Sequence, residues 1–171
     1  MSDESSAAIS ATRRDWVGEH REIYLRSGGV EGHIQDITVV GGHRLGTHCL
    51  IKVVGRKSGK VLITPLCYGA IGGEIAVVGS KGGADQHPAW YLNIREMETI
   101  DVQVATQAFR CTWREPEGEE RRKVWDFMVD GYPFYAAYQA ATDREIAIVL
   151  FAPGEEIPVF NEEDATGMRQ Y

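Results

Sequence analysis

The chain has 171 residues, 43% of them hydrophobic and 25% charged, and its formal net charge is -7. This length supports one domain with a sizeable core and is short for two. The acidic balance argues against a nucleic-acid partner, because a phosphate backbone would be repelled. No run approaches the roughly 18 apolar residues of a membrane span, and residues 1–10 lack the pattern of a signal peptide, so we expect a cytoplasmic protein.

The first structured segment is predicted to be an amphipathic helix from Thr12 to Ser27. Its apolar side chains fall on one helical face, and Gly28-Gly29 provides a stop. The many charged side chains of this helix argue against deep insertion into a membrane, whereas docking on a membrane surface stays open. We therefore expect residues 1–30 to form an N-terminal helical segment.

Runs of β-type residues follow, and their spacing indicates antiparallel pairing. Gly72-Gly73 separates two of them, at a point where a tight hairpin turn needs positive backbone angles. Strands without regular strand–helix alternation favour an α+β fold that is mainly antiparallel and forms a small barrel. The expected strands are Asp36–Val40, His48–Val54, Val61–Gly69, Glu74–Gly79, Ile100–Val104, Phe109–Arg114 and Ile146–Phe151, and the expected helices are His87–Glu96, Gly118–Asp130 and Tyr132–Ala141.

These elements give three segments along the chain: the helical residues 1–30, a barrel domain at 31–153 and an acidic tail at 154–171. The tail is expected to be peripheral, although Ile157, Val159 and Phe160 offer apolar side chains that could pack back onto the barrel.

Positive charge is concentrated in the segment Gly55–Lys60, which reads GRKSGK in a chain of negative total charge. Glycines allow close approach of a ligand, and the cations offer charge-assisted hydrogen bonds to phosphate or carboxylate. A solvated hairpin turn is an equally good interpretation. A nucleotide P-loop is not, because three residues separate Gly55 from Gly59 where four are required, and Val61 replaces the magnesium-binding hydroxyl.

A second glycine-rich turn, GSKGGA at residues 79–84, leads into the aromatic segment His87–Tyr91. Backbone amides and Lys81 could face an anion or a polar ring edge, and the aromatics offer a flat surface to a heterocycle. The turn has neither the GxGxxG nor the GxSxG pattern, so dinucleotide binding and serine hydrolysis gain no support. Trp90 and Tyr91 are otherwise ordinary core residues.

Tyr132, Tyr135 and Tyr138 recur every three residues, so a helix would place all three phenols on one broad side. They are candidates for lining a pocket or donating a proton; amphipathic packing with wet hydroxyl tips explains them equally well. No metal is expected, since the histidines lack an HExxH pattern, and His43, His48 and Cys49 have no further partner at ligand spacing. The three cysteines are odd in number and far apart, which indicates reduced thiols.

Four segments in order, GRKSGK, ITPLCY, GSKGGADQHPAWYLN and YPFYAAYQAATDREI, resemble the motifs of the deazaflavin-dependent nitroreductase and quinone reductase family. The resemblance implies a split β-barrel with flanking helices that binds coenzyme F-420, with its ring in a groove and its acidic chain on the basic turn. It also implies hydride transfer from the reduced coenzyme to a small-molecule acceptor. The acceptor would be a quinone, a nitroaromatic compound or an activated alkene.

The same resemblance assigns roles to individual positions. Ser80, Tyr132, Tyr135 and Tyr138 would border the acceptor and act in catalysis. Cofactor contacts are implied for Arg56, Lys57, Ser58, Lys60, Leu62, Ile63, Thr64, Pro65, Leu66, Cys67, Val78, Gly79, Ser80, Lys81, Ala89, Trp90, Tyr91, Leu92, Asn93 and Tyr135.

Three positions depart from the family pattern. Leu62 stands where relatives often have arginine, Cys67 where some have a pocket tyrosine, and Ala147 where a proline is common. Lys60 could replace the missing cation. Because of these departures, the acceptor of the family carries over to this chain less well than the identity of the coenzyme does.

Two alternatives to a deazaflavin reductase remain at this stage. One is the same barrel loaded with flavin mononucleotide. The other is a non-catalytic deazaflavin-binding module, because the cofactor segments are clearer than any catalytic acid or base. The sequence sets neither the physiological acceptor nor the oligomeric state.

Overall fold

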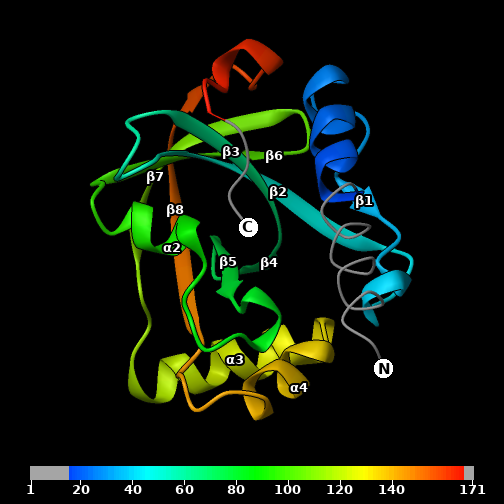
Figure 1. Ribbon diagram of the computed structural model, residues 1–171, viewed down its shortest axis with the longest axis vertical. Coiled ribbons are helices and arrows are strands. Elements are labelled where there is room, and N and C mark those ends of the chain that lie inside the picture. Colours follow the sequence, from blue (N-terminus) through cyan, green and yellow to red (C-terminus); the bar gives the residue numbers. More distant parts are fainter. Residues whose placement is uncertain (1–15, 168–171) are drawn as a thin grey trace.

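The fold is built on an eight-stranded antiparallel sheet that curls into a split barrel (Figure 1). The computed structural model describes residues 16–167. Strand order is β1-β2-β6-β7-β8-β5-β4, and β3 pairs with the other edge of β2. The strands are β1 Ile34–Gln35, β2 Gly46–Val54, β3 Val61–Cys67, β4 Gly69–Ile71, β5 Glu74–Gly79, β6 Thr99–Val104, β7 Gln107–Arg114 and β8 Ala147–Ile157.

Helices cover the ends of this sheet. The described part of the first helix spans residues 16–26, and Tyr24 anchors it in the core, where its hydroxyl donates to the carbonyl of His48 at 3.0 Å. Figure 1 shows α3 and α4 together at one end of the molecule. The other helices are α2 Ala89–Ile94, α3 Gly118–Gly131 and α4 Phe134–Ala140, with short 3-10 turns η1 Thr38–Val40, η2 Lys81–Gly83 and η3 Glu162–Asp164. Within residues 16–167 no helix has the length and apolar character to cross a membrane.

The barrel is split along a seam between β3 and β5. Within residues 16–167, β3 pairs with β2 and β5 pairs with β4 and β8, but no ladder joins β3 to β5. Behind the seam the barrel interior is closed by apolar side chains, among them the fully buried Ile51, Val77 and Phe151. The strands on the two sides of the seam are therefore held in place by the core and not by hydrogen bonds to each other.

The sequence predicted most of these elements, and the split β-barrel is confirmed. Gly72 and Gly73, at φ 57° and 80°, form the tight turn that joins Ile71 to Glu74. The expected strand Asp36–Val40 is wrong, because Asp36 Oδ1 accepts from the backbone N of Thr38 at 2.9 Å and turns the chain into the 3-10 helix η1. The expected helix start at Thr12 lies outside the described residues.

The chain after Pro153 does not leave the barrel, contrary to the expected peripheral tail. Strand β8 continues to Ile157, because it pairs with β7 along this length. Phe160 is 1% exposed, and its backbone N donates to Gln103 Oε1 at 2.7 Å. Lys52 Nζ also lies 4.6 Å from the centroid of the Phe160 ring. The division into three segments itself stays a prediction.

Because Phe160 fills the core next to Tyr24 and Leu50, Phe160→Ala should lower the free energy of unfolding by about 3–5 kcal/mol. Phe127→Ala is the matched control: Phe127 is 40% exposed, and its loss should cost about 1 kcal/mol. Urea denaturation followed by tryptophan fluorescence measures both. Equal costs for the two variants would contradict a core role for the C-terminal segment.

Candidate functional site

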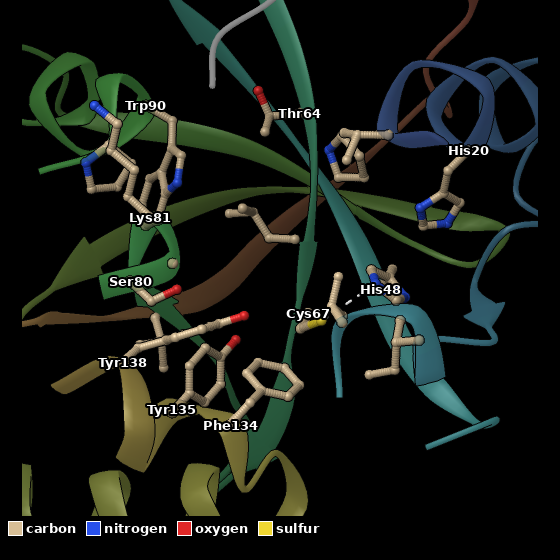
Figure 2. Close-up of a pocket in the computed structure, with 18 of the residues that line it drawn as sticks. His20, His48, Thr64, Cys67, Ser80, Lys81, Trp90, Phe134, Tyr135 and Tyr138 are labelled. Carbon is tan, nitrogen blue, oxygen red and sulfur yellow. Dashed lines mark hydrogen bonds between the residues drawn. The ribbon is translucent and has the colours of Figure 1, made fainter. Parts of the chain in front are cut away.

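The seam opens into a cavity of about 540 Å³ between β3, β5, α2, α4 and the first helix (Figure 2). Most of its lining is apolar or aromatic, with a few polar groups, which is typical of a pocket for a flat organic ligand. The lining residues are Trp16, Val17, His20, Ile37, Val40, His48, Thr64, Pro65, Leu66, Cys67, Val78, Ser80, Lys81, Gly82, Pro88, Trp90, Phe134, Tyr135 and Tyr138.

One wall of the cavity is the glycine-rich loop after β5. Gly82 and Gly83 have φ of 64° and 82°, and Lys81 also takes a positive φ of 47°. A Cβ at Gly83 would lie 2.7 Å from the carbonyl oxygen of Tyr138, so only glycine lets the loop pack this closely on α4. Figure 2 shows Ser80 beside Tyr138, whereas the Lys81 side chain lies on the side of Trp90.

The cationic turn lies next to this cavity along α2. The backbone N and Nη1 of Arg56 donate to Asn93 Oδ1 at 3.1 and 2.9 Å, which holds the turn against the helix. Trp90, one helical turn before Asn93, lines the cavity. Strand β3 leads from the turn to Thr64 in about 10 Å, at roughly 3.3 Å per residue. This distance is short enough for one extended ligand to fill the cavity and reach the turn. The Lys57 side chain is exposed there and accessible to such a ligand.

A histidine–cysteine pair stands on the opposite wall. Strands β2 and β3 place His48 across from Cys67, with Nε2 and Sγ 3.3 Å apart (Figure 2). His48 Nδ1 lies 3.1 Å from the carbonyl oxygen of Gly46 and must carry the proton to bond there, so Nε2 accepts from the thiol. Burial, and next the neighbouring His20, lowers the pKa of His48 to about 3, while burial raises the pKa of Cys67 to about 12. The pair is therefore neutral.

The three tyrosines do not lie on one face of one helix. Tyr135 and Tyr138 lie on α4 and line the cavity, and burial raises the pKa of Tyr135, so its hydroxyl keeps its proton at neutral pH. Tyr132 does not line it. This residue precedes α4 with φ -134° and ψ 79°, outside the helical region, and its hydroxyl lies 2.9 Å from the carbonyl oxygen of Tyr68. The helix starts two residues too late to carry all three phenols.

The structure brings ten of the expected site residues to the cavity: Thr64, Pro65, Leu66, Cys67, Val78, Ser80, Lys81, Trp90, Tyr135 and Tyr138. Others have different surroundings. Leu62 and Ile63 are buried in the core, and the Tyr91 hydroxyl donates to Glu115 at 2.8 Å. Gly79, Ala89, Leu92 and Asn93 do not line the cavity, and Ser58 and Lys60 are exposed on the cationic turn.

Sequence reasoning missed the wall made by the first helix and η1. Trp16, Val17 and His20 share one helical face, and this spacing was the signal that could have identified them. Ile37 and Val40 gave no signal, because their segment was expected to be a strand. Within the described part of the chain, no group of three or more His, Cys, Asp or Glu side chains is placed to hold a metal ion.

Comparison with known proteins agrees with this architecture. Residues 16–153 match the sequence model of a family described as F-420H(2)-dependent quinone reductase. Two Mycobacterium tuberculosis proteins that carry this reductase name are 28% identical over 104 residues and 27% over 115. These alignments cover 61% and 64% of this chain and 87% and 77% of the relatives.

Solved structures include two similar chains. One is described as an F-420H2-dependent reductase and is 41% identical, with a TM-score of 0.56 over 61% of this chain and 92% of its own. A second, described as a domain-swapped dimer, is 38% identical, with a TM-score of 0.59 over 81% of this chain and 98% of its own.

The depressed pKa of His48 predicts a loss of stability in acid. From its ordinary value of 6.5 down to about 3, the unfolded chain takes up a proton at His48 that the folded chain does not. The stability from neutral His48 is thus complete above pH 6.5 and is lost as pH falls through this window. Between pH 7 and 5 the wild type should lose roughly 2 kcal/mol more than His48→Gln. Urea unfolding of both at each pH measures this, and parallel pH profiles would contradict it.

Proposed function

Because the chain belongs to the F-420H(2)-dependent quinone reductase family, we propose that it reduces a quinone with a hydride from reduced coenzyme F-420 bound in the seam cavity. One observation supports this position for the coenzyme: an apolar cavity and a cationic turn lie next to each other along one helix, α2. A flat ring joined to an acidic chain has the same two-part chemistry.

The residues present fit this coenzyme. The cavity of about 540 Å³ has a mostly apolar lining, which suits a flat, largely uncharged ring. One of its walls is the glycine-rich loop, whose close packing on α4 a Cβ at position 83 would prevent. We assign the ring to Thr64, Pro65, Leu66, Val78 and Trp90. Arg56, Lys57, Ser58 and Lys60 offer the donors that phosphate and carboxylate oxygens need. When bound, the coenzyme supplies a hydride from its reduced ring.

The chain itself supplies position, exclusion of water and hydrogen-bond donors. Phe134, Tyr135 and Tyr138 on one side, with Trp16 and His20 on the other, leave an aromatic space in which a quinone can lie flat. The hydroxyls of Ser80 and Tyr138 face this space (Figure 2), where they can donate to the quinone oxygen that gains negative charge. We extend the proposal to nitroaromatic compounds and activated alkenes, which have similar flat, electron-poor groups.

Binding and turnover test the proposal directly. Titration of the protein with oxidised coenzyme F-420, followed by fluorescence, should give saturable binding at one site per chain. Mixing with reduced coenzyme and menadione should then oxidise the coenzyme. Binding without turnover on several quinones would favour a carrier module, and purification with bound flavin mononucleotide would favour the flavin alternative. Failure to bind the deazaflavin would remove the proposal.

The exposed cation Lys57 should contribute to coenzyme affinity through a screened charge contact. Lys57→Ala is expected to weaken binding severalfold near 20 mM salt and by less than about twofold near 500 mM, because salt screens exposed charges. Lys123→Ala, on the exposed face of α3, is the matched control and should bind as the wild type does. A Lys57→Ala variant with unchanged affinity at low salt would argue against the tail-binding turn.

A further inference from the structure

Arg144 lies behind the glycine-rich loop, on the side away from the cavity. Its guanidinium donates from Nε to the carbonyl of Ala84 at 3.0 Å, from Nη1 to Gly79 at 3.1 Å, and from Nη2 to Ser80 and Ala84, both at 2.9 Å. Arg144 and His87 line a separate polar hollow there, whereas Ser80 and Lys81 line the cavity. Arg144 thus holds the loop without facing the ligand.

The chemistry of this contact requires arginine. A planar guanidinium presents several donors at fixed angles, so it can bond three carbonyls of one loop together; a lysine ammonium cannot match that geometry. Burial lowers the pKa of Arg144 from its ordinary value, and the nearby Asp85 carboxylate opposes this effect. An arginine stays charged in proteins despite such a shift, which makes the four bonds charge-assisted.

The backbone around Arg144 also joins the loop to α4. Gln139, in the last turn of α4, donates from Nε2 to the carbonyl of Arg144 at 2.7 Å and accepts from the backbone N of Ile146 at 3.0 Å. Thr142 Oγ1 donates to Asp85 Oδ1 at 2.8 Å and accepts from the backbone N of Arg144 at 3.1 Å. The short segment after α4 therefore fixes the loop relative to the helix that carries Tyr135 and Tyr138.

We propose that Arg144 is a positioning residue: by bonding the carbonyls of Gly79, Ser80 and Ala84, it sets the coenzyme loop at a fixed distance from the tyrosines of α4. This inference rests on the proposed function, because it concerns the same cavity. Without the guanidinium, these carbonyls would lose four charge-assisted bonds, and Ser80 and Lys81 would no longer be held where the ring and the acceptor meet.

Arg144→Lys keeps the positive charge and removes the planar set of guanidinium donors. The variant therefore separates the effect of holding the loop from the effect of the charge. We expect coenzyme affinity, measured by fluorescence titration, to fall by about tenfold or more. Amide hydrogen exchange at Gly83 and Ala84, whose N–H groups bond within the loop, should become faster. Arg110→Lys is the matched control, because Arg110 pairs with Asp101 between β6 and β7, away from the loop and from the segment after α4. The control should bind and exchange as the wild type does.

Thr142→Val is a second, milder variant that removes the two Thr142 bonds at nearly constant volume, in case Arg144→Lys fails to fold. It should show the same faster exchange at Gly83 and Ala84 and a smaller loss of affinity. Unchanged affinity and exchange in the folded variants would overturn the inference. A wild type that does not bind the coenzyme would instead overturn the proposed function, so the two failures are distinguishable.

Discussion

The site depends on one constraint of the sheet: β3 and β5 come close but are not hydrogen-bonded to each other within the described residues. Closing that seam would give an ordinary barrel with a continuous core. With the seam open, β3 and the part of β5 beyond Ala76 have no strand partner on that side in the described part of the chain, and aromatic side chains from α2, α4 and the first helix line the space there. The cavity is thus a consequence of how the strands are ordered, and residues from distant parts of the chain meet in it.

Two kinds of chemistry are separated along α2. Trp90 contributes to an apolar space, and one turn later Asn93 holds the backbone and side chain of Arg56. The cationic turn can therefore stay exposed, where charge is easily solvated, next to a cavity with a mostly apolar lining. Under the proposed function, a ligand with both characters would gain from both regions by extending along α2, which a bare ring or a bare anion would not.

Much of this was predictable from sequence because the signals were local. The Gly72-Gly73 pair predicted the turn between two strands. The four ordered motifs indicated the barrel and ten of the residues that line its cavity. The misses came from tertiary context. Tyr132 follows the rhythm of Tyr135 and Tyr138, yet a break before α4 moves its hydroxyl onto Tyr68. The partnership of His48 with Cys67 depends on strand register, and the clamp of Arg144 on the loop spans about sixty residues of sequence, so neither is visible as a motif.

The most direct measurement is a crystal structure of the protein with oxidised coenzyme F-420. Its ring should lie in the seam cavity between Thr64–Cys67 and Val78, with the acidic chain running along α2 to Arg56, Lys57 and Lys60. A ring bound outside the seam, or an acidic chain directed away from a turn that contacts only solvent, would contradict the assignment.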